Sequence, residues 1–198
     1  MGTVKFRVEL LEEMLGTASA NPELYEEFIA SKCAAGGNED EAQTLPDVEE
    51  SIQKGTTVFH RLEDGSPFVY DYQIKGFFKD ACSMMNRYKP KKYQVRAYKK
   101  VIDGLIFPAP RKIKIELPEG GEVGICQRPL RAQTAQGERV SLARSESVPA
   151  GSVLRFEVTC LDDSIKSHLL EWMKYGELRG LGQWRNSGKG RFTFVEEE

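Results

Sequence analysis

Residues 180–192, near the end of the chain, combine residue types that could bind a phosphodiester backbone and a base. Four glycines fall within eleven residues there, and glycine allows backbone conformations and close approaches that a Cβ would prevent. Free backbone N–H groups, three cations and an indole ring would supply phosphate donors and a stacking surface. A mobile turn is the alternative interpretation. The candidate nucleic-acid-binding residues of this glycine-rich loop are Gly182, Trp184, Arg185, Gly188, Lys189, Gly190 and Arg191.

Two well-known phosphate-binding loops do not fit this stretch. A P-loop needs Ser or Thr after its Gly-Lys pair, but Lys189 is followed by Gly190, which has no hydroxyl to bind magnesium. A dinucleotide-binding loop joins a strand to a helix, whereas here a helical segment precedes the loop and the alternating residues 191–195 predict a strand after it. Nucleoside triphosphatase and dinucleotide-binding chemistry are therefore not expected from the loop.

Residues 87–100 form the most basic stretch of the chain, in which seven Lys and Arg residues interleave with three tyrosines. Cations for phosphates and rings for bases are what proteins use to bind single-stranded RNA. A solvated basic surface loop is the competing interpretation. The candidate binding residues of this basic-aromatic segment are Lys91, Lys92, Tyr93 and Arg96.

Three further cations are candidates because of the elements on which they are expected to lie. Lys75 falls in the first turn of a helix predicted from a cap at Asp71, where unpaired N–H groups and a cation suit a phosphate, although a plain surface lysine fits equally. Arg128 and Arg131 lie in the polar stretch 127–139 between two predicted strands. That stretch is either a hairpin that contacts RNA or a surface turn.

Hydrophobic patterning predicts the elements that position these residues. Helices are expected from Asn21 to about residue 35, over 71–87, and over 165–175 with a cap from residues 162–164. Residues 36–55 are expected to form an acidic connection, because they show no sustained hydrophobic periodicity. Strands are expected at 4–10, 56–61, 104–108, 111–117, 122–129, 151–161 and 191–195.

Three motifs, in this order, resemble those of the RAMP superfamily, the RNA-binding subunits of CRISPR effector complexes and related processing endonucleases. Residues 71–80 resemble its Ile-Lys-Gly helix start, and residues 145–156 resemble its Glu-x-Val-Pro-x-Gly strand start. The Gly-x-Gly and Gly-x-Gly-x-Phe pairs of residues 180–192 resemble its C-terminal glycine-rich loop.

The resemblance covers roughly residues 56–195 and implies an α+β fold. It implies a ferredoxin-like (RRM-like) core with an antiparallel sheet and inserted hairpins that holds single-stranded RNA. Other RAMP or effector subunits, or copies of the same chain, are the implied partners. The acidic first third does not align with the family, so a divergent member borne by a phage or mobile element is consistent with the sequence.

The distribution of charge supports a polyanion as partner. The chain has 198 residues, enough for one large domain or two small ones, and we interpret it as one domain with insertions. Its formal net charge of −2 hides a strong asymmetry. Residues 1–74 carry 5 Lys and Arg against 15 Asp and Glu, whereas residues 75–131 carry 14 against 5. The middle third is therefore the candidate nucleic-acid face, unless these charges are scattered over the surface. The sequence contains no apolar run long enough to span a membrane and no signal-peptide pattern, so we expect a cytoplasmic protein.

The cysteines are too widely spaced to suggest a metal site. Cys33, Cys82, Cys126 and Cys160 include no Cys-x-x-Cys pair, so reduced, partly buried thiols are expected and neither metal nor cofactor is implied.

Catalysis is less well supported than binding, because no nucleophile motif occurs and the carboxylates form no paired motif. Processing endonucleases among RAMP proteins often use a histidine as general acid and base, and His60 is a weak candidate for that role. Three hypotheses follow. The leading one is an RNA-binding RAMP-like protein holding guide-type RNA in a CRISPR-like ribonucleoprotein. The others are a metal-independent endoribonuclease, and a phage-borne interaction protein that imitates a RAMP subunit to inhibit a host effector.

Overall fold

The structure, a computed structural model, describes residues 2–20, 56–134 and 137–197, without the side chains of residues 130–141. The helix predicted from Asn21 and the acidic connection at 36–55 lie outside the described residues. Helices and mainly antiparallel sheets occur together in the described part, so the fold belongs to the α+β class. Among its helices, none combines the length and apolar character that a membrane span requires.

Within the described residues, the main sheet has seven strands in the order β12-β1-β11-β8-β6-β5, with β7 also paired to β11. All its pairings are antiparallel. Its strands are β1 (Gly2–Leu10), β5 (His60–Arg61), β6 (Pro67–Tyr70), β7 (Ile106–Ala109), β8 (Lys112–Glu116), β11 (Val153–Cys160) and β12 (Phe192–Glu197).

Alternation of side chains explains the two central strands of this sheet. In β1, Phe6 and Val8 are fully buried, and the charged Arg7 between them faces the other way. In β11, Phe156 occupies the position opposite Phe6, and the two ring centroids are 5.7 Å apart. One face of the sheet is thus apolar and must be covered.

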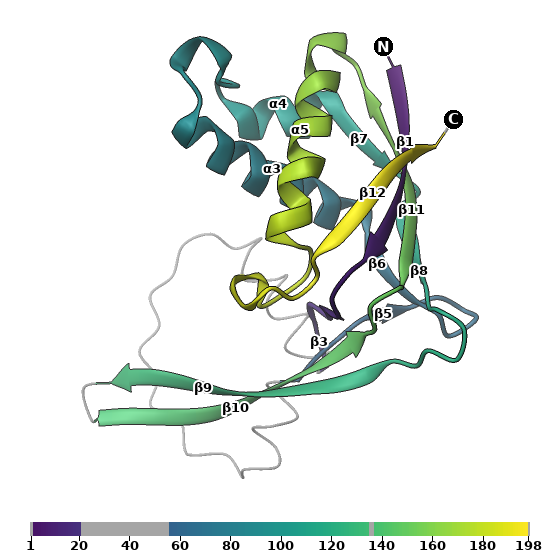
Figure 1. Cartoon of the computed structure of the whole chain (residues 1–198), viewed down its shortest axis with the longest axis vertical. Helices are drawn as coiled ribbons and strands as arrows, with labels where there is room; N and C mark the ends of the chain where they lie inside the picture. Colours follow the sequence, from purple (N-terminus) through teal and green to yellow (C-terminus); the bar gives the residue numbers. More distant parts are fainter. Residues whose placement is uncertain (1, 21–55, 135–136, 198) are drawn as a thin grey trace, which may run out of the picture.

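Two helices, α3 (Asp71–Tyr88) and α5 (Asp163–Arg179), cover that apolar face (Figure 1). The core between them includes Phe78 and Trp172, whose ring centroids are 5.9 Å apart. Asp162 caps α5 by accepting a hydrogen bond from the Ser164 N–H at 2.9 Å, as predicted. A shorter helix, α4 (Tyr98–Leu105), follows the 3-10 turn η1 (Lys91–Tyr93) and packs on α3 and β7.

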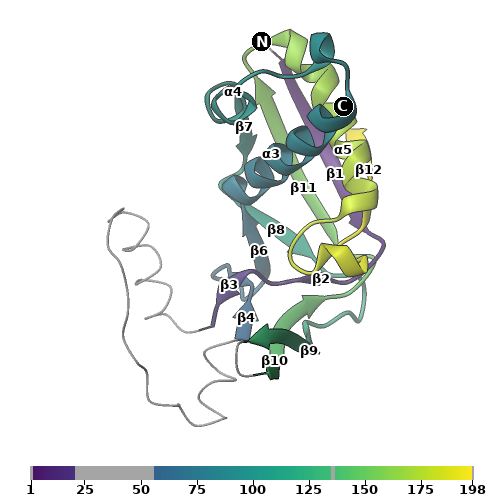
Figure 2. The ribbon, with the colours of Figure 1, turned by 90° about the vertical axis from the view of Figure 1, so that its left-hand side faces the viewer.

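A second sheet carries a long hairpin. Its order is β2-β10-β4-β3, with β9 paired to β10 along its whole length. Both views of the ribbon show the hairpin at the opposite end of the molecule from α4 (Figures 1 and 2). Its strands are β2 (Met14–Leu15), β3 (Ala18–Ser19), β4 (Thr56–Val58), β9 (Gly124–Thr134) and β10 (Gly137–Val148).

Several local predictions were wrong. Asp71 does not cap α3: the cap is Tyr70, whose N–H donates to Oε1 of Gln73 at 2.8 Å. Lys75 is consequently the fifth residue of the helix, beyond the first turn where N–H groups are unpaired. The strand expected at 104–108 begins only at Ile106, because α4 continues to Leu105.

The described cysteines are free thiols, as expected from their spacing. Cys82 and Cys160 are buried in the core, and Cys126 is half-buried on β9. Burial raises the pKa of the Cys82 thiol to about 11, so this thiol is protonated at neutral pH and is a poor nucleophile. Cys33 lies outside the described residues.

Candidate nucleic-acid interface at the glycine-rich loop

The glycines of the loop between α5 and β12 allow its two sides to pack against each other. The Leu181 N–H donates to the Gly190 carbonyl at 2.9 Å, and the Gly190 N–H donates to the Glu13 carbonyl at 2.8 Å. A Cβ on Gly190 would overlap the Leu181 carbonyl oxygen, and one on Gly180 would lie 2.5 Å from the Lys189 carbonyl oxygen. The expectation that these glycines leave N–H groups free is therefore wrong for Gly180, Gly188 and Gly190, because each of these N–H groups donates to a carbonyl of the protein.

The three loop cations bind groups of the protein. Nη1 of Arg185 lies 2.8 Å from Oδ2 of Asp80 on α3. Nε of Arg191 donates to the Glu177 carbonyl at 3.3 Å. Lys189 forms an ion pair with the side chain of Glu13, in the connection between β1 and β2. These contacts attach the loop to α3, α5 and the β1–β2 connection, so the three cations primarily position it.

The Lys189–Glu13 pair is retained over a wide pH range. The hydrogen bond from Lys189 lowers the pKa of the Glu13 carboxyl, and the same contact raises the pKa of the Lys189 ammonium group. The stabilisation is therefore complete above the unfolded pKa of Glu and below that of Lys, roughly pH 4.3 to 10.4. It is lost as the pH falls through the lowered carboxyl pKa or rises through the raised ammonium pKa. The loop thus keeps this attachment at neutral pH.

The loop meets the root of the β9–β10 hairpin at Trp184. Cζ of Arg128, on β9, lies 4.8 Å from the centroid of the Trp184 ring. Nη2 of Arg128 also donates to Oε1 of Gln183 at 3.3 Å. Trp184 has a positive φ of 52° and remains 41% exposed. The hairpin and the glycine loop are therefore joined by a guanidinium–indole stack with one accessible ring, and we call this place the junction.

The guanidinium of Arg128 is buried without a compensating charge. Arg128 is only 8% exposed, and its Nε and Nη1 atoms are buried and have no hydrogen-bond partner among the residues that the structure describes. Within the described residues, no carboxylate forms an ion pair with it. Burial of an ionised group normally requires pairing, because the desolvation penalty is several kcal/mol, so unpartnered N–H donors indicate a place for an anion.

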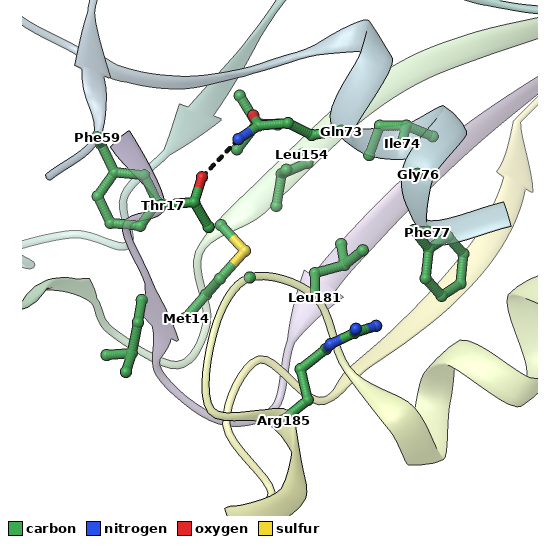
Figure 3. Close-up of a pocket in the computed structure, with 13 residues that line it drawn as sticks. Met14, Thr17, Phe59, Gln73, Ile74, Gly76, Phe77, Leu154, Leu181 and Arg185 are labelled. Carbon is green, nitrogen blue, oxygen red and sulfur yellow. Dashed lines mark hydrogen bonds between the residues drawn. The ribbon is translucent and has the colours of Figure 1, made fainter. Parts of the chain in front are cut away.

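A pocket of about 290 Å³ lies beside the loop, between α3 and the β1–β3 segment (Figure 3). Its wall is mainly apolar, with Leu181 from the loop facing Ile74 and Phe77 of α3. Thr17 and Gln73 meet at one side through a hydrogen bond of 2.6 Å, and Arg185 lies at another. Its volume is close to the ~300 Å³ at which small-ligand sites begin, so the pocket could take a flat or apolar group next to the loop.

The structure brings only some of the predicted residues together. Arg128 joins the glycine loop at the junction, while Arg131 lies farther along β9 with its side chain outside the described part. The basic-aromatic segment occupies the end of α3, η1 and the start of α4, away from the hairpin in both views (Figures 1 and 2). The cations of the middle third therefore do not form one continuous face with the glycine loop.

The remaining candidates, Lys75 and His60, are engaged elsewhere. Nζ of Lys75 donates to the Asp103 carbonyl at 3.1 Å and lies 4.6 Å from the centre of the Phe107 ring. His60 packs edge-on against Tyr70, with ring centroids 4.9 Å apart. Burial lowers the pKa of the His60 imidazole, which keeps the ring neutral at pH 7. Neither residue is part of the junction.

The open face of the main sheet does not provide the base-stacking surface typical of an RRM. The central strands β1 and β11 place charged side chains there, including Arg7, which pairs with Glu9 at 2.8 Å. Arg155 pairs with Glu116 and, at 3.5 Å, with Glu197. RRM domains stack bases on aromatic residues of these central strands. The exposed ring of the junction is therefore a better candidate for base stacking than this face.

Sequence reasoning missed the acceptors that position the loop. Glu13 and Asp80 were not candidates, because single carboxylates far from the loop in the sequence carry no local signal, and Gln183 was passed over within the loop itself. The Lys189–Glu13 contact joins residues 176 positions apart, and the Arg185–Asp80 contact joins residues 105 apart. Only the tertiary structure brings them together.

Comparisons with known proteins identify the fold but not a sequence family. No protein-family model matches the sequence, and no match was found among curated proteins. The chain is similar to a chain of the cryo-EM structure of the Type III-B Cmr-beta bound to cognate target RNA, with a TM-score of 0.55 and 11% identity over 99% of this chain. It spans 58% of that chain. A chain of a Type IV-B CRISPR complex gives a TM-score of 0.51 and 9% identity, covering 99% of this chain and 90% of the other. At these identities the likeness is one of fold, shared with chains of CRISPR complexes.

Proposed function

We propose that this protein is a RAMP-like subunit that holds single-stranded RNA of the guide type in a CRISPR-like ribonucleoprotein. The observation that carries the proposal is the Arg128 guanidinium at the junction, which is buried on the Trp184 ring with two nitrogens that have no partner in the described part of the chain. A base would stack on the exposed ring, and an RNA phosphate would complete those hydrogen bonds as charge-assisted contacts once the side chains that cover the guanidinium move aside.

The order of elements supports a ferredoxin-like core within one RAMP-like domain. β1 leads through β6 to α3, then to β7 and β8, and β11 leads to α5 and β12. In the sheet, β12 lies beside β1, and β11 lies between β1 and the pair β7 and β8. This β-α-β-β-α-β order, with both helices on one face, supports a ferredoxin-like core in which the β9–β10 hairpin would be an insertion. The likeness to chains of CRISPR complexes agrees with this proposal.

The roles within the proposed interface differ by residue. Arg128 and Trp184 would contact RNA, with Gln183 holding the guanidinium against the indole. Arg185 and Lys189 would hold the loop in place and would not contact RNA themselves, because each already pairs with a carboxylate of the protein. Other subunits of the complex would be the protein partners. In this proposal the chain binds RNA rather than cutting it.

The fluorescence of Trp184 tests the proposal. The chain has two tryptophans, of which Trp172 is 1% exposed and Trp184 is 41% exposed. We expect single-stranded RNA longer than the ~4–16 nucleotides that one single-strand-binding fold covers to quench the emission through stacking on Trp184. The quench should weaken steeply with salt, because phosphate contacts release counterions.

Two controls make the titration decisive. Trp184→Phe should remove the quench while leaving the emission of the buried Trp172, and double-stranded RNA should quench much less because its bases are not available for stacking. Absence of any quench or binding by single-stranded RNA would contradict the proposal and favour the hypothesis of a protein that binds effector subunits.

A further inference from the structure

A groove of about 380 Å³ lies at the end of the molecule opposite the hairpin, between the α3–α4 connection and the start of α5. Apolar side chains form its floor, among them Val101, Leu105 and Ile165. Its rim carries Lys92, Tyr93 and Arg96, with Asp162 and His168 on the side of α5. The volume falls within the ~300–1,000 Å³ range of small-ligand sites, so the groove can hold a group the size of one nucleotide.

The connection that forms this groove is fixed by hydrogen bonds to α3. The side chain of Asn86 accepts from the Val95 N–H at 3.1 Å and donates to the Val95 carbonyl at 3.0 Å. Nε2 of Gln94 donates to the carbonyls of Asn86 and Lys89, both at 2.7 Å. Ala97 adopts a left-handed conformation with φ of 48°, which is energetically costly for any residue that has a Cβ. The segment is therefore a preorganised loop and not a solvated linker.

Most cations at this end have no acidic partner among the described residues, unlike Arg185 and Lys189 of the glycine loop. Within the described residues, Lys89 pairs with Glu171, whereas six exposed cations form no ion pair. Tyr93 is 55% exposed, with Nζ of Lys92 4.6 Å from its ring centroid. The six cations, which we call the distal cluster, are Arg87, Lys91, Lys92, Arg96, Lys99 and Lys100. A surface with this much uncompensated charge attracts a polyanion.

We propose that the groove between the α3–α4 connection and α5 is a second contact for single-stranded nucleic acid. A base would lie against Tyr93 and the apolar floor, and the adjoining phosphates would bind Lys92 and Arg96. This site is separate from the junction, which lies at the hairpin end, so the inference goes beyond the proposed function. An acidic protein segment would satisfy the cations, but it would leave the apolar floor and the exposed ring without a use. Flat bases joined by phosphates use all three features.

The test compares two double variants that change the charge equally. Lys92→Glu with Arg96→Glu alters the groove, and Lys112→Glu with Lys174→Glu alters two exposed lysines on β8 and α5 that do not line it. Binding of a long single-stranded RNA is measured by fluorescence anisotropy over a range of salt concentrations. We expect the groove variant to lose at least about tenfold in affinity and its salt slope to fall by about 1.4, at ~0.7 per phosphate contact on a single strand.

Equal affinities and slopes for the two variants would overturn the proposal. So would retention of RNA binding by the groove variant together with loss of binding to poly-glutamate, since that result would assign the groove to an acidic protein. The same titration with Arg128→Met separates this inference from the proposed function. If only Arg128→Met loses RNA affinity, the junction is supported as a binding site and the groove is refuted as a second contact. If only the groove variant loses RNA affinity, the groove is supported and the junction is refuted. Matching melting temperatures of the variants exclude unfolding as the cause.

Discussion

Replacing Arg128 by methionine is expected to weaken RNA binding by about 10–100-fold while leaving the free protein as stable as before or more stable. The guanidinium is buried, and two of its nitrogens have no partner within residues 2–20, 56–134 and 137–197 as described, so its removal relieves a desolvation cost. Methionine keeps a similar volume and a favourable sulfur contact with the Trp184 ring. In the complex, however, the lost charge-assisted hydrogen bonds are worth about 1.5–3 kcal/mol. RNA titrations and urea unfolding of the same preparations measure the two effects.

Arg155→Met is the matched control for that substitution. Arg155 is exposed on the open face of the main sheet, where it already pairs with Glu116 and Glu197. We expect its replacement to change RNA affinity little, and to change stability little as well, because solvent-exposed ion pairs contribute little to stability. A strongly destabilised Arg128→Met protein would show that the guanidinium has a structural partner, and unchanged affinity would remove it from the interface.

Replacing Gly190 by alanine should destabilise the protein by about 3–5 kcal/mol and abolish RNA binding at the junction. A Cβ at this position would overlap the Leu181 carbonyl oxygen, and the φ of 70° adds a cost of ~1–2 kcal/mol for any L-residue. Relief of the overlap requires the Leu181–Gly190 and Gly190–Glu13 hydrogen bonds to break, which would detach the loop from the β1–β2 connection. Chemical unfolding and the Trp184 quench report the two losses.

Gly188→Ala separates the two causes. Gly188 has a φ of 85°, but a Cβ there would meet nothing closer than Cδ of Arg191 at 4.0 Å. Only the conformational cost of ~1–2 kcal/mol should therefore appear. Equal losses in the Gly188 and Gly190 variants would contradict the inference that close packing of the two sides of the loop determines its shape.

Regular patterns made much of the fold predictable. The alternation in β1 and β11 and the spacing of Phe77, Phe78 and Cys82 on α3 depend only on which face each residue buries. The cap of α3 was misassigned, because Asp71 is a good capping residue but the backbone turns one residue earlier, at Tyr70. Likewise, α4 extends through Gly104 to Leu105, where sequence reasoning expected a strand.

The candidate site was only partly predictable, since charge and aromatic content do not reveal partners. Lys189 looks like a phosphate ligand in the sequence, yet it pairs with Glu13 from the other end of the chain. Arg128 looks like one surface arginine among several, yet packing of the hairpin root against Trp184 buries it. The basic-aromatic segment was recognised, but its separation from the glycine loop depends on the direction of α3 across the sheet (Figure 1).

Photo-crosslinking with 4-thiouridine in a single-stranded RNA, followed by mass spectrometry of the attached peptides, tests the central claim most directly. The claim is that RNA binds where the glycine-rich loop meets the hairpin root. The predicted result is attachment within residues 180–191, at or beside Trp184, together with loss of that adduct in Arg128→Met. Efficient attachment elsewhere on the chain, with none in the loop or the hairpin root, would contradict the claim.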